Sequence, residues 1–224
     1  MPGRKTPLIT NEIYHVYNRG IDRRPTFTSK REYQRGVETL IFYRHTRLPL
    51  RLSQYLQLSL DDRENALNRL QNSSVLVRVI SYCLMPNHFH LLLKQVEDKG
   101  ISKFLSNFQN SYTRYFNTRH RRDGSLFLDQ FKAVRIETDE QLLHVSRYIH
   151  LNPYASYVVK SLEELEMYEY SSLSDYLEAG EGWVNKEIVL NFYRERSRYK
   201  EFVFNQADYQ RKLKKIEHLM IEKY

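Results

Sequence analysis

The chain has 224 residues, with 35 Lys and Arg against 27 Asp and Glu, and an isoelectric point near 9.4. Apolar residues make up 41% of it and aromatic residues 13%, which excludes general disorder and indicates one compact domain with a small appendage. It has no secretory signal, no apolar run of about 18 residues and only one cysteine, which excludes disulfides within the chain and zinc fingers. These features predict a cytoplasmic protein that does not enter membranes.

The positive charge is concentrated in the first part of the chain. Residues 1–135 carry 23 Lys and Arg against 11 Asp and Glu, whereas the remaining residues carry 12 against 16. Basic segments that also contain Tyr and Asn suit a polyanion, because guanidinium groups bind phosphate and aromatic rings stack on unpaired bases. A solubilising surface without a ligand is the alternative interpretation.

The first elements along the chain are a strand and a helix. Residues 12–17 alternate in polarity and predict a strand, and residues 18–20, Asn-Arg-Gly, predict a turn after it. The capping box formed by residues 29–32 predicts a helix from about residue 30 to about residue 45. Residues 46–73 mix Leu and Gln with acidic residues and indicate an insertion with a short helix.

A hairpin and a second helix follow the insertion. Residues 75–85 and 88–94 are rich in strand-forming residues and flank Pro86 and Asn87, so they predict a β-hairpin. Residues 101–117 place aromatic and aliphatic side chains on one helical stripe, which indicates a helix packed on a sheet.

The last elements of the domain complete a recognisable order. Residues 125–136 predict a strand, and a capping box at Thr138 opens a helix that Pro153 is expected to end. The order strand, helix, hairpin, helix, strand, helix predicts an α+β domain with a ferredoxin-like antiparallel sheet and its helices on one face. We assign this domain to residues 1–153 and a helical C-terminal extension to residues 154–224.

Two histidines in the second hairpin strand are candidate metal ligands. His88 and His90 are two residues apart, so a strand presents both imidazoles on one face. They can bind a divalent cation if other groups complete the coordination, and such an open site suits catalysis. The alternative is two ordinary histidines without a ligand.

The helix that begins at Thr138 offers a nucleophile. His144, Tyr148 and Asn152 are spaced four residues apart and are expected to share an outward face. A nearby divalent cation that polarises a phosphodiester helps a phenol such as Tyr148 to attack it. The amide oxygen of Asn152 is a weaker candidate, either as a third metal ligand or as a group that positions the phosphate.

Three motifs in this order resemble the signatures of the single-tyrosine HUH transposases, related to insertion-sequence transposases. They are Tyr-His-Val-Tyr-Asn-Arg-Gly at 14–20, Tyr-Cys-Leu-Met-Pro-Asn-His-Phe-His-Leu-Leu-Leu at 82–93, and Tyr-Ile-His-Leu-Asn-Pro at 148–153. The longer C-terminal part, with Tyr-Glu-Tyr-Ser-Ser-Leu-Ser-Asp-Tyr-Leu at 168–177, resembles the branch of REP-associated tyrosine transposases.

The resemblance implies a ferredoxin-like DNA strand transferase. His88 and His90 would bind Mg²⁺ or Mn²⁺, and Tyr148 would attack single-stranded DNA to form a 5′-phosphotyrosine. Asn152 matches the polar position four residues after the tyrosine, where many relatives have Gln, so the histidines are the stronger ligand candidates. The substrate would be a DNA hairpin with a flanking recognition sequence. Insertion-sequence relatives are commonly dimers that exchange the tyrosine helix, whereas residues 154–200 favour a monomer here.

Several alternatives remain open at the level of the sequence. Tyr112 and Tyr115 could act as a tyrosine pair, but both fall on the apolar stripe of their helix. A nicking endonuclease of the replication-initiator or relaxase type would use the same cleavage step, and a domesticated relative would bind DNA without catalysis. In each case the DNA is expected to contact basic residues near the predicted strand ends and the second helix. These residues are Arg19, Arg23, Arg24, Arg114, Arg119, Arg121, Arg122, Lys132 and Arg135.

Overall fold

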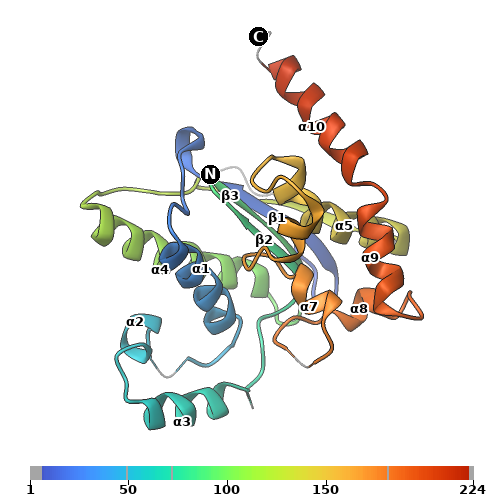
Figure 1. Cartoon of the computed structure of the whole chain (residues 1–224). Helices are drawn as coiled ribbons and strands as arrows, with labels where there is room; N and C mark the ends of the chain where they lie inside the picture. The colour runs from blue at the N-terminus through green and yellow to red at the C-terminus, as the bar shows by residue number, and fades with distance from the viewer. Residues whose placement is uncertain (1–6, 49, 72, 181, 222–224) are drawn as a thin grey trace.

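The computed structural model describes residues 7–48, 50–71, 73–180 and 182–221. At its centre is a four-stranded antiparallel sheet in the order β2-β3-β1-β4 (Figure 1). The strands are β1 (Ile13–Arg19), β2 (Val77–Met85), β3 (His88–Gln95) and β4 (Lys132–Ile136). This order, with β1 and β3 in the middle, confirms the ferredoxin-like antiparallel sheet.

The two crossover helices cover one face of the sheet. These helices, α1 (Lys30–Tyr43) and α4 (Gly100–His120), lie next to each other in Figure 1. Phe89 on β3 contacts Phe108 on α4, with ring centroids 5.2 Å apart. Because side chains alternate along a strand, His88 and His90 point to the opposite face.

A third long helix, α5 (Asp139–Ala155), covers that opposite face. The ring of Tyr148 on α5 lies 5.4 Å from the ring of His90. The expectation of helices on one face therefore holds for α1 and α4, while the helix that carries Tyr148 adds a second layer. Pro153 does not end this helix, because the Ser156 N–H still bonds to the Asn152 carbonyl at 3.0 Å and closes the last turn.

Two segments differ from the sequence prediction. Of residues 125–136, only β4 is a strand, and its pairing with β1 stops at Tyr17. The segment before β4 leaves the ladder and is tied to the end of β1 by a bond from the Leu128 N–H to the Arg19 carbonyl. The insertion contains two helices, α2 (Leu52–Tyr55) and α3 (Leu60–Gln71), because Leu52 and Leu70 form a small apolar cluster with Phe42.

The C-terminal part continues the core of the domain. It contains α6 (Leu162–Glu166), α7 (Leu173–Leu177), α8 (Glu187–Leu190), α9 (Arg196–Phe204) and α10 (Ala207–Ile221). Tyr176 and Tyr199 are fully buried in the same apolar core as the sheet residues. The first turns of α10 pack on α5, and its far end projects from the body of the domain (Figure 1). Within the described ranges, no helix is both long and apolar enough to cross a membrane.

Candidate active site

His88, His90 and Tyr148 meet in a pocket of about 500 Å³ between the sheet and α5. The two imidazole rings lie 5.0 Å apart at right angles, and Tyr148 stands edge-on to His90. Four cationic side chains also line the pocket, namely Arg19, Arg23, Lys132 and Lys214. The pocket therefore combines two imidazoles, one phenol and several cations, a set that suits a phosphodiester.

Hydrogen bonds fix the orientation of both imidazoles. The Nδ1 of His88 lies 2.6 Å from Oδ1 of Asn87, whose Nδ2 donates to the Arg23 carbonyl. An amide oxygen only accepts, so Nδ1 of His88 donates and its Nε2 keeps a lone pair. The Nδ1 of His90 lies 3.0 Å from Nε2 of His15, and a donor at that Nδ1 likewise leaves the Nε2 of His90 free.

Burial keeps these histidines neutral at physiological pH. It lowers the pKa of His15 to about 4. Burial, with a further contribution from the Lys214 charge, also lowers the pKa of His88 to about 4. Burial and the neighbouring His88 and His15 hold the pKa of His90 well below its usual value. A neutral imidazole is the form that binds a metal ion.

Asn152 lies beside His88 and is fully buried, not outward-facing as the helical spacing suggested. Its side chain makes a smaller contribution that raises the pKa of His88, against the lowering by burial. Its Nδ2 is buried without a hydrogen-bond partner in the part of the chain that the structure describes, while Oδ1 accepts from Ser156 Oγ at 3.3 Å. The reverse orientation of the amide would let Nδ2 donate to Ser156 and would present the oxygen in the orphaned position.

These donors fit a divalent cation bound by nitrogen and oxygen. Among the described residues, no third His, Cys, Asp or Glu forms a metal-binding group with His88 and His90. The remaining ligands would therefore be the Asn152 amide, water or oxygens of the DNA phosphate.

Tyr148 is held by the C-terminal helix. Gln210 Nε2 on α10 donates to the Tyr148 carbonyl at 3.2 Å, and Lys214 Nζ lies 5.8 Å from the centre of the Tyr148 ring. His144, in contrast, is exposed and bonds to Arg147 on its own helix, so it does not join the site. One helical turn displaces it by about 6 Å along the axis from Tyr148.

The alternative tyrosine pair lies on the wrong side of the sheet. Tyr112 is a buried residue of α4, and its hydroxyl donates to the Thr26 carbonyl at 2.6 Å. Tyr115 is on the same helix and contacts Arg35. Neither tyrosine reaches the face that carries the two histidines, so Tyr148 is the phenol of this site.

The nine basic residues expected to contact DNA are distributed over several places. Arg19, Arg23 and Lys132 line the pocket. Arg24 pairs with Asp22, and Arg135 pairs with Glu12 at 3.0 Å, so both charges are neutralised locally. Arg121 and Arg122 lie at the C-terminal end of α4, and Arg114 and Arg119 line a groove between α1 and α4.

Sequence reasoning missed His15, which contacts His90, and Lys214, which lines the pocket. His15 on β1 is a diagonal neighbour of His90, since it pairs with Leu92 two residues further along β3. The alternation of residues 13–19 could have placed His15 on the histidine face once the strand register was known. No pattern in the sequence indicates that Lys214 lies at the site, because it reaches the site only through the packing of α10 on α5.

Comparisons with known proteins agree with this geometry. Residues 51–152 match the sequence profile of the family described as IS200-like transposases. The structure of the REP-associated tyrosine transposase bound to a REP hairpin is similar in fold, with a TM-score of 0.55 and 14% identity, over 81% of this chain and 93% of that one.

Two further comparisons add no weight. A candidate transposase from Deinococcus radiodurans R1 has a TM-score of 0.36 and 12% identity, over 66% of this chain and 95% of that one, which is too low to support an argument. No curated protein matches the chain. The profile match covers both histidines and Tyr148, so residues 51–152 of this chain are similar to the IS200-like transposases, and the fold of the chain is similar to that of the REP-associated tyrosine transposase.

Proposed function

We propose that this protein is a transposase that cleaves and rejoins single-stranded DNA through a covalent bond to Tyr148. The observation that carries the proposal is the contact of Tyr148 with His90, at 5.4 Å between ring centres, in a pocket lined by four cationic side chains. A nucleophile, a pair of neutral imidazoles and phosphate-binding cations are the groups that phosphodiester transfer requires.

His88 and His90 would hold Mg²⁺ or Mn²⁺ through their free Nε2 atoms, and Asn152 is a further candidate ligand. The cation would supply the polarisation of the scissile phosphate. Asn87 and His15 keep the two imidazoles in the tautomer that such binding needs.

The chain's own residues carry out the transfer. Arg19, Arg23 and Lys132 bind the phosphate backbone at the pocket, and Lys214 adds a positive charge beside Tyr148. The Tyr148 oxygen attacks phosphorus and loses its proton, while the bond to the 3′ oxygen breaks and that oxygen takes up a proton. The products are a 5′-phosphotyrosine and a free 3′ hydroxyl. Attack by another 3′ hydroxyl reverses the step without an external energy source.

The proposed substrate is a hairpin with a single-stranded flank. The attacked phosphodiester must be unpaired to enter a pocket of about 500 Å³. The solved structure with the similar fold was obtained with a REP hairpin, which supports the same class of ligand here.

A denaturing gel tests the reaction. With Mn²⁺ and an oligonucleotide labelled on the 3′ side of the cleavage site, we expect a covalent protein–DNA adduct that Tyr148→Phe abolishes. Tyr157→Phe, which alters an exposed tyrosine, is the matched control and should retain the adduct. Cleavage without rejoining would indicate a nicking endonuclease, and binding without an adduct would indicate a non-catalytic DNA-binding protein.

A further inference from the structure

A second large depression lies on the other side of the sheet from Tyr148. It is a groove of about 810 Å³ between α1 and α4. Arg51 and Ser53, at the start of α2, contribute to its wall, so the insertion that follows α1 helps to build it. We call this depression the α1–α4 groove.

The α1–α4 groove is strongly basic. Its lining includes five arginines, and none of the described residues that line it is Asp or Glu. Arg31 and Arg114 are exposed, and their side chains have no ion-pair partner within the described ranges. The five arginines are Arg31, Arg35, Arg51, Arg114 and Arg119. Arg35 pairs with Glu38 and Arg119 pairs with Glu32, so Arg31, Arg51 and Arg114 carry most of the excess positive charge, which favours an anionic ligand.

Two polar atoms of the lining residues are left unsatisfied. Arg35 has a side chain only 11% exposed, and its guanidinium lies 5.2 Å from the ring centre of Tyr115. The Nε of Arg35 and the hydroxyl of Tyr115 are both buried without a hydrogen-bond partner among the residues described. Buried polar atoms usually have partners, so two orphans in one wall point to a ligand rich in oxygen acceptors.

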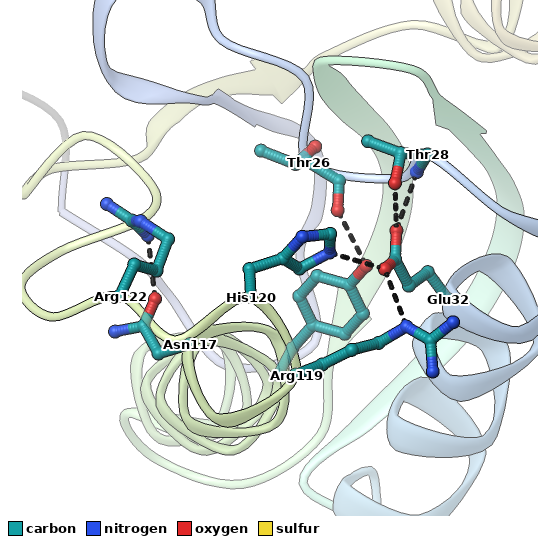
Figure 2. Close-up of polar contacts among 8 residues, drawn as sticks. Thr26, Thr28, Glu32, Asn117, Arg119, His120 and Arg122 are labelled. Atoms are coloured by element: carbon teal, nitrogen blue, oxygen red, sulfur yellow. Dashed lines mark hydrogen bonds and ion pairs between the residues drawn. The ribbon is translucent and has the colours of Figure 1, made fainter.

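The width of the α1–α4 groove is fixed by a buried carboxylate. Figure 2 shows Thr28 from the segment before α1, and Arg119 and His120 from α4, converging on Glu32 of α1. His120 Nε2 lies 2.7 Å from the Glu32 carboxylate, whose side chain is 1% exposed. The two helices are therefore held together before any ligand arrives, which reduces the entropic cost of binding.

Basic residues connect the α1–α4 groove with the catalytic pocket. Arg121 and Arg122, at the end of α4, line a depression that shares Arg114 and Thr118 with the groove. Arg122 Nη2 then donates to the Ser125 carbonyl, and the Leu128 N–H donates to the carbonyl of Arg19, which lines the catalytic pocket. The segment of residues 122–128 thus joins the basic end of α4 to the end of β1, where Arg19 lines the catalytic pocket.

We infer that the α1–α4 groove is a second binding site for single-stranded DNA, occupied by a stretch of the same strand that Tyr148 cleaves. The inference rests on the proposed function. Arginines bind the phosphates, Tyr43 in the lining is an aromatic side chain for an unpaired base, and Asn107 and Asn110 offer hydrogen bonds. A volume of about 810 Å³ exceeds what one phosphate needs, so several nucleotides are accommodated. The strand bends round the end of the sheet to reach both sites.

A binding assay with two sets of hairpins tests this inference. One set has only a short flank that fills the catalytic pocket, and the other has a long single-stranded extension on the 5′ or the 3′ side. In fluorescence anisotropy we expect the wild-type protein to bind one of the extended hairpins about tenfold more tightly. The double variant Arg31→Gln/Arg114→Gln should lose this gain, and its salt slope on the extended hairpin should fall by about 1.4, or 0.7 per lost phosphate contact.

Controls separate the groove from the catalytic pocket. Arg194→Gln/Arg198→Gln removes the same charge from exposed positions in the C-terminal part and should leave the gain intact. Ser53→Glu, a single exposed change in the groove wall, should act like the double variant. The short-flank hairpin should bind and form the adduct equally well with all of these variants.

Two results would overturn the inference: equal affinity of the wild type for short and extended hairpins, or equal weakening of both by the groove variants. Failure of the proposed catalysis would look different. The adduct would then be missing with the wild type and the short-flank hairpin, while the gain from the extension persisted.

Discussion

At the residue scale, the site depends on which nitrogen of each imidazole is free. For the more buried histidine, the contact between His15 Nε2 and His90 Nδ1, at 3.0 Å, leaves Nε2 free when Nδ1 of His90 is the donor. Partners of this kind typically change metal affinity by about 10–100-fold when they are removed. His15 thus acts on the cation through His90 without touching it.

The first prediction concerns this partner. His15→Leu should lower Mn²⁺ affinity about 10–100-fold, measured by isothermal titration calorimetry, because His90 Nδ1 loses its hydrogen-bond partner. His15→Gln should recover part of the loss, and His144→Leu, at an exposed position on α5, should have no effect. An unchanged Mn²⁺ affinity in His15→Leu would show that the contact does not orient His90.

A second prediction follows from the separation of metal binding and DNA binding. His88→Ala should abolish cleavage but leave most of the DNA affinity, because phosphate contacts by Arg19, Arg23 and Lys132 dominate binding. Excess EDTA should have the same two effects on the wild type. Full cleavage by His88→Ala in EDTA, seen on the denaturing gel, would remove the metal from the mechanism.

The sequence predicted the residues that lie within one motif better than those that meet across elements. His88 and His90 are two residues apart in one strand, and Tyr148 lies in a helix whose start is marked by the nearby Thr138. Both patterns can be read from short stretches of the sequence. His15 needed the register between β1 and β3, and Lys214 needed the position of a helix 66 residues after Tyr148. Neither register nor helix docking follows from local periodicity.

At the element scale, α5 is fixed to the helices that follow it by a buried polar network. His150 Nδ1 lies 2.7 Å from the Tyr199 hydroxyl on α9, and its Nε2 lies 2.8 Å from Ser172 Oγ just before α7. Tyr199 also bonds to Ser146, one turn before His150 on α5. The network holds the helix that presents Tyr148 to the pocket.

This network makes stability depend on pH. Burial lowers the pKa of His150 to about 3, so the folded state binds fewer protons than the unfolded state between pH 6.5 and pH 3. Acidification through this window must destabilise the fold, by about 2 kcal/mol between pH 6.5 and pH 5 for this residue alone. Denaturant unfolding at several pH values should show the loss.

Variants identify the residue responsible. His150→Gln should make the dependence of the unfolding free energy on pH less steep, while the buried His15, His88 and His90 still contribute to it. His144→Gln changes an exposed histidine on the same helix and should leave the dependence as in the wild type. If His150→Gln had the wild-type slope, the buried imidazole would not be the source.

The elements themselves were largely predictable, and the exceptions have physical causes. The helix from Thr138 continues past Pro153 because a proline in the last turn removes only one hydrogen bond of the helix. Residues 46–73 form two helices because Leu52 and Leu70 pack on Phe42. This contact could not be predicted from the local sequence pattern. The strand expected from residue 125 is limited to β4, which pairs with β1 only between Ile13 and Tyr17.

At the scale of the whole molecule, Tyr148 can act with the histidines of its own subunit or with those of a second subunit. In this chain Tyr148 already contacts His90 of its own sheet, and α10 ties α5 down through Gln210 and through Arg211 Nε, which donates to the Tyr154 carbonyl at 3.0 Å. Because the C-terminal part of the same chain holds α5 in place, α5 need not be exchanged with a second subunit to complete the site. We therefore expect a monomer to be active.

Mixing two inactive chains tests this expectation. Tyr148→Phe supplies intact histidines and His88→Ala supplies an intact tyrosine, so an exchanged dimer would restore one complete site. We expect no restored adduct on the denaturing gel and a monomer mass in light scattering. Restored activity would show that α5 moves between subunits.

The single cysteine has a practical consequence for following the DNA. Cys83 is fully buried in β2, and burial raises the pKa of its thiol. Labelling reagents that need a thiolate will therefore not react with Cys83. A cysteine introduced at exposed Ser53 could then carry the only reactive thiol in the described part of the chain. A fluorophore there, paired with one on the DNA, would report the arrival of the strand molecule by molecule, without any change to the native sequence around the histidines.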